Sequence, residues 1–183
     1  MIYIVLADGF EEIEALCPYN LICRAKLPVK FVALGNMTPK GCTCGHPVEC
    51  DITIEEALAS EDKIDLLMFP GGLPGAYNCD NHPLTTALIE KAIAHDAYLA
   101  AICAAPMVFG TRGLLRGVHA TAYPDFIKYL DGAVIGDDER VCVDGKFITA
   151  AGMGVAFPFG VEIIRALCSD ETALAIKNRV RGI

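Results

Sequence analysis

Cys103 has the strongest case in this sequence for nucleophilic chemistry. It follows the apolar run 97–102 and precedes Ala104-Ala105-Pro106, so it lies at a predicted junction between a strand and a helix. Small residues two positions before and after a nucleophile are the steric requirement of a nucleophile elbow, here with Cys in place of Ser and Ala in place of Gly. The free N–H groups of the following helix favour a thiolate. Without further context, a buried core cysteine among alanines is the alternative.

The pair Gly71-Gly72 makes the nucleophile hypothesis stronger. It follows the apolar run 65–69 and Pro70. Adjacent glycines after a strand allow backbone N–H groups to approach a substrate oxygen, as in an oxyanion hole, although Gly-Gly alone indicates only a turn. Ligands of open α/β sheets bind beyond the carboxyl ends of the strands, which is where this loop and Cys103 are expected.

Three acidic residues open the predicted helix 11–26. Helical angles place Glu14 about 100° from Ile13, at the edge of an apolar stripe, whereas Glu11 and Glu12 point further away. The stripe consists of Ile13, Leu16, Cys17, Asn20, Leu21 and Arg24. Because burial raises a carboxyl pKa, Glu14 is predicted to titrate above about 4.3. Glu11 and Glu12 are interpreted as first-turn acids that complement the helix dipole.

Short apolar runs alternate with helical patterns, which favours an α/β fold with a mostly parallel sheet covered on both faces. Predicted strands are 2–7, 29–34, 65–69, 97–102, one near 118–121, and 140–143 and 146–150, joined by a hairpin turn at Asp144-Gly145. Predicted helices are 11–26, 54–60, 83–95, one opening at 103, 155–168 and 170–180. Residues 41–53 are expected to be irregular and 70–75 a loop. No linker or repeat interrupts the chain, so 1–183 is expected to be one domain.

Composition excludes several classes of protein. Hydrophobic residues make up 54% of the chain and charged residues 21%, which excludes intrinsic disorder. A net charge of -8 disfavours nucleic acid as a partner. No apolar run is long enough to span a membrane, and the N-terminus lacks the pattern of a signal peptide, so a cytoplasmic protein is expected.

Nine scattered cysteines without a framework spacing are expected to be reduced, and most of them to be small buried hydrophobes. The cluster Cys42, Cys44, His46 and Cys50 could suggest zinc. However, residues two apart in extended chain stand about 6.6 Å apart, and a tetrahedral site needs a tighter knuckle. No metal and no cofactor are therefore predicted. The histidines interpreted as surface or helix-end residues are His82, His95 and His119.

Three segments in this order resemble the ThiJ/PfpI superfamily, in the branch of the parkinsonism-associated deglycase and its bacterial relatives. They are Gly-Phe-Glu-Glu-Ile-Glu at 9–14, Pro-Gly-Gly at 70–72 and Ala-Ala-Ile-Cys-Ala-Ala-Pro at 100–106. The likeness extends through Gly152-Met153-Gly154 to the C-terminal helices. It implies a flavodoxin-like three-layer sandwich, a homodimer, and a reactive Cys103 beside a protonated Glu14.

The resemblance also implies further site residues. Backbone N–H groups of Gly72 and Ala104 would line the oxyanion pocket, and Gly71 would complete the turn. The other residues placed around the pocket are Arg24, Tyr123 and Met153.

This sequence departs from the family pattern at several positions. The peptidase branch has His directly after the nucleophile, where this chain has Ala104, so proteolysis is disfavoured. Kinase activity is disfavoured as well, because the chain has no Gly-x4-Gly-Lys phosphate loop. Cys44, Tyr123 and Met153 stand where relatives carry Arg, His and Pro, so no histidine base is assigned.

The resemblance implies a glyoxalase or deglycase that needs no cofactor. Cys103 would attack a small carbonyl substrate, such as a 2-oxoaldehyde, or its adduct on a glycated protein, and Glu14 would relay a proton. The pKa of Cys103 is predicted to lie below the ordinary thiol value of roughly 8.5. The alternative is a redox sensor or stress chaperone that uses reversible oxidation of Cys103.

Overall fold

The computed structural model describes residues 1–136 and 140–181, which form a seven-stranded sheet in the order β3-β2-β1-β4-β5-β7-β6. The strands are β1 (Ile2–Leu6), β2 (Val29–Ala33), β3 (Ile52–Thr53), β4 (Leu66–Phe69), β5 (Tyr98–Ile102), β6 (Val141–Asp144) and β7 (Phe147–Ala150). Every neighbouring pair is parallel except the hairpin β6–β7. The predicted α/β fold with a mostly parallel sheet is confirmed.

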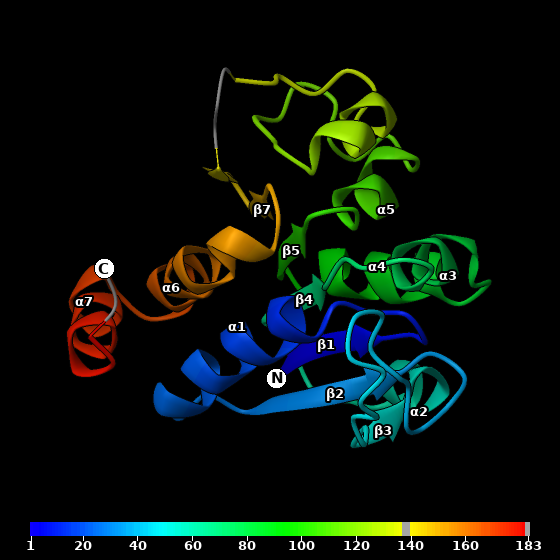
Figure 1. Cartoon of the computed structure of the whole chain (residues 1–183), viewed down its shortest axis with the longest axis horizontal. Helices are drawn as coiled ribbons and strands as arrows, with labels where there is room; N and C mark the ends of the chain where they lie inside the picture. Colours follow the sequence, from blue (N-terminus) through cyan, green and yellow to red (C-terminus); the bar gives the residue numbers. More distant parts are fainter. Residues whose placement is uncertain (137–139, 182–183) are drawn as a thin grey trace.

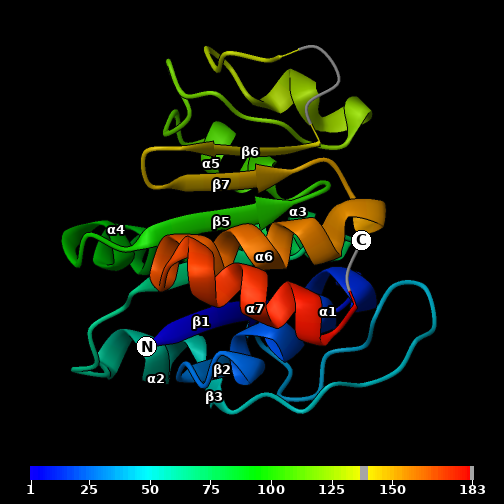
Figure 2. The same ribbon diagram turned by 90° about the vertical axis from the view of Figure 1, so that its left-hand side faces the viewer.

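Helices cover both faces of this sheet, giving three layers (Figures 1 and 2). One face carries α1 (Glu12–Arg24), α6 (Ala156–Leu167) and α7 (Asp170–Arg179), which lie in front in Figure 2. The other carries α2 (Ile54–Ala59), α3 (Gly75–Asn81), α4 (Thr85–Ala94) and α5 (Pro106–Gly110). The described residues also form two short 3-10 helices, η1 (Pro124–Tyr129) and η2 (Met153–Val155).

Side chains of each strand alternate between two apolar cores. In β1, Tyr3 and Val5 join the core under α2–α5, whereas Ile2, Ile4 and Leu6 join the core under α1 and α6. All five are buried. Because both faces of the sheet are covered, the strands are continuous apolar runs and not alternating ones.

Helix α1 lies close to α6 because α6 has a glycine at the contact. A Cβ on Gly160 would stand 2.7 Å from Leu21 Cδ1 and 3.1 Å from Pro18 Cα. Contacts this short leave no room for a side chain, so Gly160 permits the close approach of the two helices. This packing fixes the position of α1, which carries Glu14.

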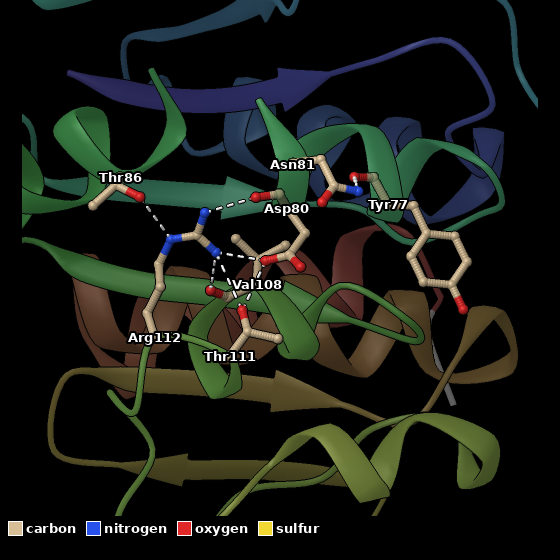
Figure 3. Close-up of polar contacts among 7 residues, drawn as sticks. All are labelled: Tyr77, Asp80, Asn81, Thr86, Val108, Thr111 and Arg112. Atoms are coloured by element: carbon tan, nitrogen blue, oxygen red, sulfur yellow. Dashed lines mark hydrogen bonds and ion pairs between the residues drawn. The ribbon is translucent and has the colours of Figure 1, made fainter. Parts of the chain in front are cut away.

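An ion pair with its own hydrogen-bond network holds α3, α4 and α5 together (Figure 3). The Arg112 guanidinium donates to Asp80 Oδ1 at 2.6 Å, to the Asp80 carbonyl at 2.8 Å, to the Val108 carbonyl at 2.8 Å and to Thr86 Oγ1 at 3.0 Å. Thr111 Oγ1 also donates to Asp80 Oδ1. The network fixes α5, the helix that follows Cys103 in the chain.

Several predicted elements differ from the structure. The expected strand near 118–121 is a single bridge between His119 and Val134, because the chain there forms a loop over the sheet edge. The helix expected from 103 begins at Pro106, and the one expected from 83 begins at Thr85. Helix α3, which starts inside the expected loop 70–75, and η1 were not predicted, because both are short and lack an apolar period. The β6–β7 hairpin and the two C-terminal helices are confirmed.

The apolar stripe predicted for the first helix is wrong in part. Ile13 is 49% exposed and Leu16 is 37% exposed. The buried face of α1 instead includes Ala15, Pro18 and Leu21. Because α6 packs against Pro18 and Leu21 through Gly160, Ile13 and Leu16 are left facing outward.

Across residues 1–136 and 140–181, no helix combines the length and the apolar character needed to cross a membrane.

Candidate active site

Cys103 sits at a strained turn directly after β5. Its φ is +64°, in the left-handed region that residues other than glycine rarely adopt. The turn is fixed on both sides, because the Cys103 N–H donates to the Ala150 carbonyl at 2.8 Å and the Tyr123 N–H donates to the Cys103 carbonyl at 2.8 Å. A half-buried side chain on a sharp turn after a strand is the geometry of a nucleophile elbow, as the sequence predicts.

Glu14 is completely buried at the start of α1. Its Oε2 accepts the Gly71 N–H at 2.9 Å, and its own N–H donates to the capping Glu11 carboxylate at 2.8 Å. Oε1 has no hydrogen-bond donor among the described residues, and the carboxyl lies beside the Cys103 thiol. Burial above all raises the pKa of Glu14, and the negative charge of Glu11 adds to this effect. The hydrogen bonds from Cys103 and Gly71 favour the ionised carboxylate and oppose the rise, so the pKa reaches about 7. The predicted direction of the Glu14 pKa is confirmed.

The two glycines after β4 have different roles. The N–H of Gly71 is used by Glu14, so Gly71 is not the oxyanion donor that the sequence allowed. Gly72 has a φ of +89°, and a Cβ there would lie 2.4 Å from the Glu11 nitrogen. The N–H groups of Gly72 and Ala104, the two donors that the resemblance implies, face the Cys103 sulfur, where they favour negative charge.

The pKa of Cys103 moves in the direction opposite to the sequence prediction. Burial and the neighbouring Glu14 carboxylate raise the pKa of the Cys103 thiol to about 12, and the N–H groups of Ala104 and Gly72 only partly oppose them. Sequence reasoning gave too much weight to the following helix, which is five residues long and begins only at Pro106. Because two negative charges in contact are unfavourable, Glu14 and Cys103 hold one proton between them above pH 7.

Glu12, predicted to be an exposed first-turn acid, is buried. Its carboxylate accepts the Cys44 N–H at 2.7 Å and the Thr43 N–H at 3.3 Å. Burial opposes ionisation, but these backbone N–H groups outweigh it and lower the pKa of Glu12. Glu12 therefore ties the irregular segment that contains Cys44 to α1. Helical periodicity could not reveal this, because the partner of Glu12 is a loop.

The Tyr123 N–H donates to the Cys103 carbonyl, and Tyr123 and Met153 both line a groove of about 710 Å³. Arg24 does not. Its Nε donates to Asn20 Oδ1, and it lies ten residues beyond Glu14 along α1, roughly 15 Å away by helical rise. Arg24 is therefore not a pocket residue of the Cys103 site within this chain.

The other cysteines and the histidines lie outside the site. The prediction that most cysteines are buried is wrong. Cys50, Cys79 and Cys142 are buried; Cys23, Cys42, Cys44 and Cys168 are exposed. His82 and His95 follow the last residues of α3 and α4, and His119 lies beside the β6 strand. In the two described stretches, no three His, Cys, Asp or Glu side chains are grouped closely enough to hold a metal ion.

Comparison with known proteins decides the family. The model of the DJ-1/PfpI family matches residues 1–166. The chain belongs to the DJ-1/PfpI family. Among solved structures, oxidised Toxoplasma gondii DJ-1 superposes with a TM-score of 0.91 at 31% identity, covering 98% of this chain and 97% of that one. The flavodoxin-like three-layer fold implied by the sequence is thereby confirmed.

DJ-1/PfpI relatives match most of this chain. Parkinson disease protein 7 homolog of Danio rerio is 30% identical, over 95% of this chain and 93% of its own length. Protein DJ-1 homolog B of Arabidopsis thaliana is 31% identical, but the 97% of this chain that matches spans only 40% of that protein. Two relatives have names that state a chemistry. Glutathione-independent glyoxalase DJR-1.2 of Caenorhabditis elegans is 26% identical, over 90% of this chain and 86% of its own length. Deglycase PYRAB04690 of Pyrococcus abyssi is 27% identical, over 91% of this chain and 98% of its own length.

Proposed function

We propose that this DJ-1/PfpI protein is a cofactor-independent glyoxalase or deglycase that acts in carbonyl and oxidative stress on 2-oxoaldehydes or their adducts with protein thiols and amines. The observation that carries the proposal is the contact between Glu14 and Cys103 at the elbow, with the N–H groups of Gly72 and Ala104 facing the sulfur. The printed names of the nematode and archaeal relatives support the same chemistry.

The first step joins Cys103 to the substrate. Sγ forms a bond to the aldehyde carbon of R–CO–CHO while the shared proton of the pair rests on Glu14. The C=O π electrons move onto the aldehyde oxygen, where the Gly72 and Ala104 N–H groups stabilise the negative charge. Glu14 then gives its proton to this oxygen, and the product is a hemithioacetal.

The second step moves hydrogen between the two carbons. Glu14, again a carboxylate, takes the proton from the former aldehyde carbon and gives it to the ketone oxygen, which forms an enediol. Glu14 then takes the hydroxyl proton from the former aldehyde oxygen and delivers it to the former ketone carbon, so that the C=O bond forms at the carbon bonded to sulfur. One carbon is oxidised and the other reduced, so no external oxidant is needed. The result is a thioester of a 2-hydroxy acid on Cys103. Water hydrolyses the thioester, releasing the acid and restoring the thiol.

Turnover of methylglyoxal tests this proposal. We expect wild type to form lactate steadily, Cys103→Ala to form none, and Glu14→Gln to lose about 10²- to 10⁴-fold in kcat. Cys168→Ala, which removes an exposed cysteine outside the site, is the matched control and should behave as wild type. Lactate formation by Cys103→Ala, or none by well-folded wild type, would contradict the proposal.

The second candidate function is a redox sensor or stress chaperone. It is favoured by the same two N–H groups, which could bind the oxygens of an oxidised Cys103. Limiting peroxide, followed by peptide mass spectrometry, should then oxidise Cys103 before the exposed Cys23 and Cys168. Oxidation spread evenly over the three would count against a special site. Steady lactate formation favours the enzyme; preferential oxidation without turnover favours the sensor.

We further propose a cytoplasmic homodimer with no nucleic-acid or membrane partner. The support for the dimer is the outward apolar face of α1, where Ile13 and Leu16 are exposed beside Cys17. Exposed apolar groups gathered on one helix are typical of a protein interface. Many scattered cysteines suit a reducing compartment.

A further inference from the structure

The walls of the groove lined by Tyr123 and Met153 are connected to the backbone of Cys103. One wall begins at Ala151, next to Ala150, whose carbonyl accepts the Cys103 N–H. The other wall contains Tyr123, whose N–H donates to the Cys103 carbonyl. Both walls are therefore held to the backbone of the reacting residue.

The groove is mostly apolar. Tyr123 is 48% exposed, Ile135 is 41% exposed and Met153 is 53% exposed, and all three line it. Other apolar lining residues are Pro124, Ile127 and Val155. Large apolar side chains that gather around one hollow mark a binding site more often than a plain surface. Arg140 is the one charged residue among the described residues of its lining.

The volume of the groove exceeds the needs of the smallest substrates. At about 710 Å³ it falls within the range of pockets for drug-sized ligands, roughly 300–1,000 Å³. Methylglyoxal, with a methyl substituent, would leave nearly all of it unused. A ring or a branched chain attached to the ketone carbon would bury apolar surface against Tyr123 and Met153.

We propose that this groove binds the substituent R of a 2-oxoaldehyde R–CO–CHO, and that the preferred substrates carry an aryl or branched alkyl R. The inference rests on the proposed function and follows the same reaction, in which R–CO–CHO and water give R–CHOH–COOH. The substrate is the occupant because the groove wall at Tyr123 is hydrogen-bonded to the backbone of the nucleophile.

Gly154 offers a way to fill the groove without disturbing the fold. It lines the groove, its φ lies outside the left-handed region, and a Cβ built on it meets no atom within 4 Å. A phenylalanine at this position can therefore occupy the groove. Met153→Ala makes the opposite change. It shortens an exposed side chain of the groove and so removes part of the apolar contact with R.

The experiment compares kcat/KM for phenylglyoxal and methylglyoxal in wild type, Gly154→Phe and Met153→Ala. We expect wild type to prefer phenylglyoxal at least tenfold, mainly through KM, since the groove contact is made before and during reaction. Both variants should lower the ratio of the two kcat/KM values by at least fivefold. Leu174→Phe, which adds the same ring on the exposed side of α7, is the matched control and should keep the wild-type ratio.

The outcomes separate this inference from the proposed function. Methylglyoxal turnover without a preference for phenylglyoxal, or an equal loss for both substrates in Gly154→Phe, overturns the groove assignment and leaves the glyoxalase proposal standing. Absence of turnover with either substrate overturns both. Sedimentation of the same proteins tests whether a second copy of the chain occupies the groove instead. If Gly154→Phe loses the dimer but keeps the wild-type ratio of the two kcat/KM values, the groove belongs to the dimer interface and the inference is overturned.

Discussion

Glu14 and Cys103 lie on either side of Gly71, and they can meet only because Gly71 has no side chain. A Cβ at this position would stand 2.6 Å from Glu14 Oε2 and 2.7 Å from Cys103 Cβ. The Gly71 N–H also donates to Glu14 Oε2. One glycine therefore supplies both the space in which the acid and the thiol touch and the hydrogen bond that orients the acid.

Gly71→Ala should separate the two reacting groups. Because the new methyl group overlaps both neighbours, we expect kcat/KM for methylglyoxal to fall by about 10²-fold or more, as for a displacement of about 1 Å in an active site. Overpacking should also cost about 1–3 kcal/mol of unfolding free energy. Kinetics and urea unfolding measure the two effects. A folded Gly71→Ala protein with wild-type kcat/KM would show that the contact is not needed.

The raised pKa of Glu14 predicts how stability depends on pH. Below pH 4.5 the carboxyl is protonated in both the folded and the unfolded chain, so it has no effect. Between pH 4.5 and about 7 the unfolded chain releases this proton while the folded chain keeps it, so stability falls as pH rises. Above about 7 the loss is complete and amounts to about 3 kcal/mol.

Glu14→Gln isolates this effect, because it keeps the shape of the side chain and cannot ionise. Urea unfolding at pH 4.5, 6, 7 and 8.5 should show wild type losing stability relative to Glu14→Gln over this interval, with the difference constant above it. A difference that does not vary with pH would mean that Glu14 titrates normally in the folded protein.

The reacting centre could be predicted from the sequence because its geometry is local. The small residues around Cys103 fix the elbow, and the glycines after β4 fix the loop beside it. The buried position of Glu14 was predicted from a stripe through Ile13, which is exposed. Glu14 is buried for another reason: its carboxyl lies against Gly71 and Cys103, which follow β4 and β5.

The features that could not be predicted from the sequence depend on contacts between segments that are distant in the chain. Glu12 is buried by a loop some 30 residues away in the chain, which no helical period records. The pKa of Cys103 depends on the distance to Glu14 and on burial, and neither follows from residue type. Arg24 was placed near the pocket by resemblance alone, and within this chain it does not line the groove that Tyr123 and Met153 share.

The apolar face of α1 predicts the oligomeric state. Leu16→Glu puts a charge on this face, and burying an unpaired charge in an interface is strongly unfavourable. We therefore expect wild type to sediment as a dimer and Leu16→Glu as a monomer. Ile93→Glu, at a similarly exposed apolar position on α4, is the matched control and should remain dimeric. A monomeric wild type, or two variants that behave alike, would contradict an interface at α1.

The last prediction concerns the Arg112 network that supports the helix behind the elbow (Figure 3). The side chains of Arg112 and Asp80 are only 17% and 16% exposed, so their ion pair is shielded from water and salt. Lysine keeps the charge but cannot reach Asp80, Val108 and Thr86 together, because its ammonium lacks the planar fork of a guanidinium. Arg112→Lys should therefore leave buried acceptors without donors and cost about 2–4 kcal/mol of unfolding free energy.

Arg116→Lys is the control for this prediction. Arg116 also pairs with an aspartate, Asp131, but these side chains are 70% and 75% exposed. Exposed pairs contribute little, so the change should stay within about 0.5 kcal/mol. Urea unfolding in low and high salt completes the test, because only the exposed pair should respond to salt. Equal losses in both variants would mean that burial does not set the strength of the Arg112 network, and that α5 is held at the elbow by apolar packing alone.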